Sequence, residues 1–307
     1  MDSYHLVTRR DFIRQSTVSL AGSALVASLG LGTAEAQEGS DKPQVRIGLL
    51  ADLHFADKPP RGTRHYRETL DKLAEAAGRF QQEKPDLIVE LGDLIDSADS
   101  LEVEKDYLRR IASEFAAVSG QRHFVLGNHC VSALTKPEFL DIVGQKSSVY
   151  SFDTKGVHFV VLDACFRSDG APYGRNNFQW TDANIPPGQI EWLRADLKQT
   201  AHKTLVFVHQ RLDVGPPYGV KNASEIHRIL KESGKVLAVL QGHYHFNAYK
   251  ELDGVRYVTL AAMVEGTGEE NNAYAVMDIL PGDAIQIRGF RKQKSYEWRL
   301  PAETVAK

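Results

Sequence analysis

Cysteine is scarce in this sequence of 307 residues, which contains two, Cys130 and Cys165. Two cysteines exclude a fold held together by several disulfides. A surplus of charge of one sign is absent too, because 37 Lys and Arg residues face 40 Asp and Glu residues, giving a formal net charge of −3. A general nucleic-acid binder would carry a basic surplus, so we expect no stable binding to nucleic acid.

A long apolar run is also missing. The most apolar stretch near the start, residues 18–32, is interrupted by Ser and Gly and falls short of the roughly 20 residues of a membrane span. It follows the pair Arg9-Arg10 and precedes Ala34-Glu35-Ala36, an A-x-A cleavage site. This arrangement resembles a twin-arginine (Tat) signal peptide. We therefore predict a signal over residues 1–36, transient contact with the Tat machinery and a periplasmic or extracellular protein; a frayed amphipathic terminus is the alternative.

The rest of the composition is that of a globular protein, with 42% hydrophobic and 25% charged residues. It shows neither an internal repeat nor a linker. We therefore predict one domain over residues 37–300 and a C-terminal tail over residues 301–307.

Strand and helix patterns alternate in the first half of this domain. Apolar, β-rich runs at 45–50, 87–91 and 123–126 are separated by two stretches with helical spacing, one from Tyr66 to Phe80 and one from Leu101 to Phe115. This order predicts a parallel sheet with helices on its faces. The second half contains a hairpin signal at Lys155-Gly156 and strands joined by short turns, as in antiparallel sheets.

Residues of metal-binding types follow five of the predicted strands. They are Asp52 and His54, Asp93, Asn128, His209, and His243 with His245. Ligands bind at the carboxyl ends of the strands in open α/β sheets, so we expect the five loops to converge. Carboxylates, imidazoles and an amide oxygen without thiolates suit a pair of divalent ions. Each motif is weak by itself, and the prediction depends on their order and shared position.

The chain resembles the calcineurin-like metallophosphoesterases over about residues 45–246. The resemblance is carried by five motifs in this order: D-x-H, G-D, G-N-H, a lone H and G-H-x-H. The resemblance implies an α/β fold, a four-layer α/β/β/α sandwich of two mixed β-sheets flanked by helices. It implies one metal site with Asp52, His54 and His245, a second with Asn128, His209 and His243, and Asp93 bridging both. Two ions, Mn, Fe or Zn, would supply a bridging hydroxide that attacks phosphorus.

The same resemblance assigns roles beside the metals. His129 matches the catalytic histidine that protonates or stabilises the leaving oxygen. Asp96 matches the carboxylate that partners this histidine in phosphoprotein phosphatases, and a helix cap or turn is its alternative. Cys130 stands where most of the superfamily has Asp or Glu. A Cys130–Cys165 disulfide formed after export is one hypothesis, and two buried free thiols are the other.

Three arginines are candidates for binding the substrate. Arg61 and Arg64 follow the first metal loop, in a stretch that resembles the manganese-dependent ADP-ribose/CDP-alcohol diphosphatases. Arg211 lies two residues after His209 and suits a phosphate, with a salt bridge as its alternative. The unpatterned loop over residues 166–187 is either a lid, whose aromatic and amide groups suit a nucleoside or sugar, or a packed structural loop.

These observations predict an exported two-metal phosphoesterase that acts on a small phosphorylated substrate. We expect a phosphomonoester first, with a phosphodiester or a nucleotide-type pyrophosphate as the alternative. A metal-binding scaffold without turnover is the alternative of another class, and it is disfavoured because neither a ligand nor His129 is missing. The sequence does not predict the oligomeric state.

Overall fold

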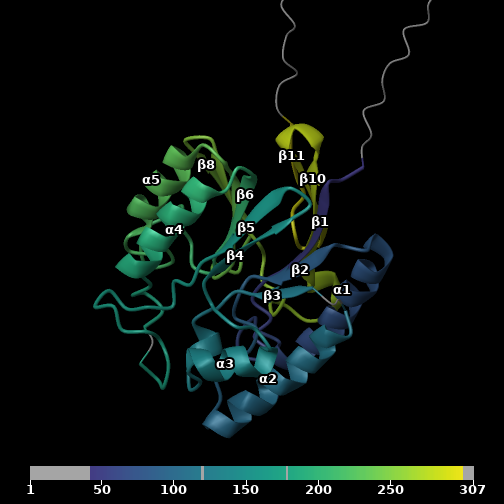
Figure 1. Ribbon diagram of the computed structural model, residues 1–307. Helices are drawn as coiled ribbons and strands as arrows, with labels where there is room; N and C mark the ends of the chain where they lie inside the picture. Colours follow the sequence, from purple (N-terminus) through teal and green to yellow (C-terminus); the bar gives the residue numbers. More distant parts are fainter. Residues whose placement is uncertain (1–41, 119–120, 178, 300–307) are drawn as a thin grey trace, which may run out of the picture. The chain divides into compact units, whose positions relative to one another are not determined.

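Two six-stranded β-sheets face each other across an apolar core in the computed structural model, which describes residues 42–118, 121–177 and 179–299 (Figure 1). Ile47 and Val89 on one sheet share this core with Phe159 and Phe207 on the other. The predicted sandwich of two mixed sheets flanked by helices is therefore confirmed. The predicted signal at residues 1–36 and the tail at residues 301–307 lie outside the described residues.

The first sheet has the order β12-β11-β10-β1-β2-β3. Its strands are β1 (Val45–Leu50), β2 (Leu87–Glu90), β3 (Arg122–Phe124), β10 (Ala273–Leu280), β11 (Ala284–Arg291) and β12 (Tyr296–Trp298). Strands β1, β2 and β3 are parallel, as the alternation of strands and helices predicts. Strand β10 then joins β1 in the antiparallel sense, which makes the sheet mixed.

The second sheet has the order β4-β5-β6-β7-β9-β8. Its strands are β4 (Tyr150–Thr154), β5 (Val157–Val161), β6 (Lys203–Phe207), β7 (Val236–Gln241), β8 (Ala248–Leu252) and β9 (Val255–Thr259). The predicted hairpin joins β4 to β5 through Lys155 and Gly156, both of which have positive φ. Strands β5, β6, β7 and β9 run parallel, so their carboxyl ends lie along one edge.

Helices cover the outer face of each sheet (Figure 1). Those on the first sheet are α1 (Thr69–Glu83), α2 (Leu101–Ala116) and α3 (Lys136–Val143), and those on the second are α4 (Pro187–Gln199) and α5 (Ala223–Ser233). Short 3-10 turns are η1 (Tyr66–Glu68), η2 (His129–Val131), η3 (Glu269–Asn271) and η4 (Pro281–Asp283). None of the helices within the described ranges combines the length and apolar character that a bilayer crossing requires.

Backbone hydrogen bonds connect the loops that follow the parallel strands. After β1, the amides of Asp52 and His54 donate to the carbonyls of Gly92 and Asp93 after β2, at 3.0 and 2.7 Å. In the second sheet, the amide of Gly242 after β7 donates to the carbonyl of His209 after β6, at 3.0 Å. These bonds hold together the two loops of each pair, which carry six of the seven predicted ligands.

Candidate metal centre

The seven predicted ligands gather at the strand ends, and five of them have left-handed backbone. Asp52, His54, Asp93, His243 and His245 have φ between 45° and 70°. This region is uncommon for residues other than glycine, and Asp, Asn and His enter it most readily. The sharp local turns aim successive side chains at the same point.

A first group of ligand atoms comes from Asp52, His54 and His245, which lie within 4.8 Å of one another. Asp52 Oδ1 is 3.9 Å from His54 Nε2 and 3.5 Å from His245 Nε2. The two Nε2 atoms are 3.1 Å apart. This is the first set that the family resemblance implies.

The opposite ring nitrogens explain why a cation fits between these two imidazoles. His54 Nδ1 lies 3.1 Å from Asp96 Oδ2, and His245 Nδ1 lies 2.6 Å from Glu265 Oε1. Ionised carboxylates only accept hydrogen bonds, so both Nδ1 atoms carry the proton and both Nε2 atoms present lone pairs. Two lone pairs at 3.1 Å repel each other, and a shared or adjacent cation removes that repulsion. A carboxylate behind a ligating histidine is the usual arrangement at metal sites.

A second group contains Asp93, His209 and His243. His209 Nε2 lies 3.1 Å from Asp93 Oδ2, while its Nδ1 donates to the Leu91 carbonyl at 2.8 Å. Asn128 Oδ1 and His243 Nε2 are buried without a hydrogen-bond partner among the described residues. A buried polar atom left in this way costs about 1–3 kcal/mol. A metal ion coordinated by these atoms would satisfy both.

Asp93 lies between the two groups. Its Oδ2 is 3.6 Å from His54 Nε2 of the first group and 3.1 Å from His209 Nε2 of the second. Its Oδ1 accepts a hydrogen bond from the backbone amide of His129 at 2.8 Å. Gly127 lines this carboxylate so closely that a Cβ there would collide with it. This position suits a carboxylate that would bridge two metal ions.

The electrostatics of the site also favour bound cations. Burial lowers the pKa of His54 to about 3, so this ring is neutral and its Nε2 is free to ligate. Burial opposes a charge on His209 as well, but the carboxylates of Asp93 and Asp52 outweigh it and raise its pKa to about 9. The same negative potential attracts a metal ion.

His129 and Asp96 meet beside the first group. His129 Nδ1 lies 3.5 Å from Asp96 Oδ1. Burial opposes charging of His129, but Asp93 and Asp96 outweigh it and raise its pKa. Asp96 also binds His54, as described, and accepts from Lys58 Nζ at 2.8 Å. It thus orients a candidate ligand as well as the candidate acid.

A cavity of about 230 Å³ opens above these ligands. Asp93, Asn128, His243 and His245 line one part of it. The remaining walls are Arg64, His129, Trp180 and Tyr218.

Of the three candidate substrate arginines, only Arg64 lines this cavity. Arg61 is exposed and forms backbone hydrogen bonds with Arg64. Arg211 is buried, and its guanidinium pairs with Asp213 through bonds of 3.0 and 2.5 Å. Arg211 therefore forms a salt bridge, which was the alternative to a phosphate-binding role, and this salt bridge is buried.

Both cysteines are buried free thiols. The Sγ atom of Cys165 donates to the Leu126 carbonyl and accepts from Gln210 Nε2, both at 3.4 Å. Burial raises the pKa of both thiols well above the usual value. The structure therefore has the free-thiol alternative and not the Cys130–Cys165 disulfide.

Glu265, Trp180 and Tyr218 contribute to the site without a sequence motif. Glu265 lies in the loop after β9, 20 residues after His245, which it orients. Trp180 lies in the unpatterned loop over residues 166–187, where no spacing distinguishes it from the other aromatic residues. Tyr218 follows two prolines, and no spacing relates it to the ligands.

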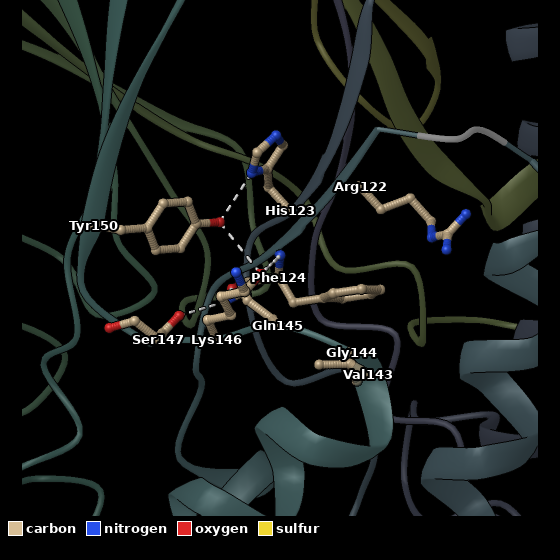
Figure 2. Close-up of a pocket in the computed structure, with 9 residues that line it drawn as sticks. All are labelled: Arg122, His123, Phe124, Val143, Gly144, Gln145, Lys146, Ser147 and Tyr150. Atoms are coloured by element: carbon tan, nitrogen blue, oxygen red, sulfur yellow. Dashed lines mark hydrogen bonds between the residues drawn. The ribbon is translucent and has the colours of Figure 1, made fainter.

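A larger cavity, of about 430 Å³, lies elsewhere (Figure 2). His123, Gln145 and Tyr150 point toward one another there, and the Tyr150 hydroxyl lies 2.9 Å from His123 Nδ1 and donates to Gln145 Oε1 at 3.2 Å. Burial lowers the pKa of His123 to about 4. None of the candidate ligands lines this cavity, and the Tyr150 hydroxyl pairs with both His123 and Gln145.

The fold and the ligand set define a metal-dependent hydrolase of phosphoric esters with a dinuclear centre. The family model for calcineurin-like phosphoesterases matches residues 45–247, and the chain belongs to this family.

Two relatives whose names state an activity share about a quarter of their residues with this chain. A manganese-dependent ADP-ribose/CDP-alcohol diphosphatase of Danio rerio is 25% identical over 300 residues, covering 76% of this chain and 92% of that protein. The Arabidopsis thaliana protein of the same name is 23% identical, covering 73% and 88%. Among solved structures, a dimetal phosphatase from Danio rerio has a TM-score of 0.74 at 20% identity, covering 83% of this chain and 99% of that one. This structural likeness supports the fold.

Proposed function

We propose that the protein cleaves the pyrophosphate bond of a small diphosphate diester, the class that includes ADP-ribose and CDP-alcohols. The observation that carries this proposal is the place of Arg64, which lines the cavity beside His129 and the candidate ligands. A pyrophosphate diester carries a negative charge on each of its two phosphates. Metal ions at the candidate ligands would neutralise one phosphate, and a guanidinium beside those ligands suits the other. The names of the two relatives support the same class. This proposal replaces the expected preference for a phosphomonoester.

Different residues around the cavity serve metal binding, phosphate binding and proton transfer. The candidate ligands would hold two metal ions, which when bound would supply Lewis-acid activation of water and of one phosphate. Arg64 holds the other phosphate through charge-assisted hydrogen bonds. Asp96 fixes His129 by its Nδ1, which leaves Nε2 to protonate the bridging oxygen as the P–O bond breaks.

A substrate comparison tests the proposal. With manganese, the purified protein should hydrolyse ADP-ribose and CDP-glycerol with kcat/KM at least about tenfold above that for AMP and p-nitrophenyl phosphate. Arg64→Gln should lower kcat/KM for the diphosphates about 10- to 150-fold, the range for a lost hydrogen bond to a charged group. Arg61→Gln, at the neighbouring exposed arginine, is the matched control and should change little. Faster hydrolysis of the monoesters would overturn the proposal.

We also propose that the protein is exported. The support is Arg9-Arg10 ahead of the apolar stretch and the A-x-A site that follows it. The full chain should accumulate outside the cytoplasm, shortened by about 36 residues. Replacing both arginines by lysine should leave it in the cytoplasm at full length, as judged by cell fractionation and mass spectrometry. Equal export of that variant would contradict a twin-arginine signal.

A further inference from the structure

Two large aromatic side chains stand exposed at the mouth of the metal-site cavity. Trp180 is 41% exposed and Tyr218 is 39% exposed, and both line the cavity. Their ring centroids are 5.6 Å apart. Exposed aromatic groups of this size forgo the burial that usually stabilises them, so their place beside ligand-type residues points to a ligand.

Both rings contact the same candidate metal ligand. The His243 ring lies 6.0 Å from Trp180 and 6.1 Å from Tyr218, centroid to centroid. The Tyr218 ring also lies 5.0 Å from the Tyr244 ring, and the Tyr244 ring lies 5.5 Å from Phe246, centroid to centroid. An aromatic surface therefore extends outward from the metal site.

The positively charged side of the cavity lies next to the other group of candidate ligands. Arg64 and His129 both lie beside Asp96, which binds His54. The aromatic pair instead lies beside His243. A substrate over the metals therefore meets apolar rings past His243 and positive charge past His54.

We propose that Trp180 and Tyr218 stack the nucleobase of the substrate and so fix its direction in the cavity. The inference rests on the proposed pyrophosphatase function. A flat, largely apolar ring is the ligand that suits two adjacent aromatic side chains, and its phosphates then extend over the candidate ligands toward Arg64.

This direction decides which phosphorus is attacked. The water oxygen bonds to the phosphorus that carries the nucleoside, and the bond from that phosphorus to the bridging oxygen breaks. The bridging oxygen leaves with the other phosphate and takes a proton from His129, and a proton released from water restores His129. The products are a nucleoside monophosphate and a phosphate monoester.

Substitutions at the aromatic pair test the stacking. Trp180→Ala should raise KM for ADP-ribose about 5- to 150-fold, the range for one lost base–aromatic stack, and Trp180→Phe should recover most of it. KM for P1,P2-dimethyl pyrophosphate, which has no base, should stay the same. Tyr249→Ala removes an aromatic ring that is 41% exposed outside this cavity and serves as the control. An equal rise in KM for both substrates in Trp180→Ala would show a structural role and overturn the stacking.

A binding measurement separates this inference from the proposed function. AMP should quench the fluorescence of the protein, inorganic phosphate should not, and Trp180→Phe should lose the quenching. Lack of quenching in a protein that cleaves ADP-ribose would overturn the inference alone. Quenching in a protein that cleaves no pyrophosphate would uphold stacking and overturn the proposed function.

Hydrolysis of ADP-ribose in H2(18)O tests which phosphorus is attacked. The label should appear in AMP, and label in ribose 5-phosphate would overturn the proposed direction.

Discussion

Asp96 Oδ1 lies 3.5 Å from Nδ1 of His129, while Oδ2 of the same carboxylate binds His54 at 3.1 Å. One side chain thus positions both a candidate metal ligand and the candidate acid. A substitution of Asp96 therefore disturbs two functions at once. A substitution of His129 separates them, because this ring lines the cavity and its removal leaves Asp96 on His54.

His129→Ala should retain both metal ions and lose activity. The expected loss in kcat is about 10²- to 10⁴-fold, the usual contribution of a general acid. Metal analysis and steady-state kinetics on the same sample measure both quantities. His202→Ala, at an exposed histidine, is the control. Full activity in His129→Ala would show that another group protonates the leaving oxygen.

Asp93→Asn should lose metal as well as activity. Its Oδ2 faces ligands of both groups, and a neutral amide cannot hold two cations through one oxygen as well as a carboxylate does. Metal analysis of the purified protein should show fewer than two ions per chain. Asp169→Asn, in an exposed loop, should keep the wild-type content. Two tightly bound ions in Asp93→Asn would contradict the bridging role.

Glu265→Gln should weaken metal binding without removing a ligand. Glu265 accepts from His245 Nδ1 at 2.6 Å and so fixes the ring with its lone pair at Nε2. Loss of such a partner lowers metal affinity about 10- to 100-fold. Calorimetric titration of the metal-free protein with Mn²⁺ measures the change, and Glu251→Gln on the exposed strand β8 is the control. Unchanged affinity would mean that the His245 ring is held by other contacts.

Gly127→Ala should damage the site through a steric clash. The added Cβ would strike the Asp93 side chain and its backbone nitrogen, so the loops after β2 and β3 must separate. We expect loss of metal and activity. Gly78→Ala in α1 meets no atom within 4 Å and should stabilise the helix by up to about 1 kcal/mol. Circular dichroism and metal analysis check both variants, and normal metal content in Gly127→Ala would argue against close loop packing.

Stability should fall in acid partly through Glu138. Burial opposes its charge, but Arg175 and Thr135 outweigh it and lower the pKa of Glu138 to about 2 from 4.5. A folded-state pKa below the unfolded value stabilises the protein above about pH 4.5, and this stabilisation disappears as the pH falls toward 2. Glu138→Gln should cost up to about 1 kcal/mol in the free energy of unfolding at pH 6, because a glutamine can still close the capping box of α3 but loses the ion pair with Arg175.

Urea unfolding at several pH values checks this expectation. The difference between wild type and Glu138→Gln should shrink between pH 5 and pH 3. Glu191→Gln, at an exposed glutamate, provides the control. A difference that stays constant over this range would show that Glu138 acts through packing rather than charge.

The order of motifs predicts the candidate site well because its chemistry is local in sequence. Each ligand follows a buried strand directly, and parallel strands bring their ends to one edge. Strand β1 has the predicted bounds, and α2 begins at the predicted Leu101. The helical stretch predicted from Tyr66 to Phe80 lies in η1 and α1, and α1 itself begins at Thr69.

Residues defined by distant contacts were beyond prediction. Glu265 owes its role to His245, which lies 20 residues earlier in the loop after another strand, and no periodicity encodes this pair. Strand β8 has mostly exposed residues and therefore lacks the alternation that marks a strand. Helix α3 has only eight residues, too few for a clear stripe, although its capping box is visible in the sequence.

The left-handed backbone at five candidate ligands has a consequence for engineering. Exchanging His54 for Glu or Cys to select another ion would change the donor atom and also place a residue less suited to φ of 45° at that turn. Metal preference and folding are then not independent design variables in this protein. Retuning the ion is better attempted at Asn128 or His209, whose backbone has ordinary negative φ.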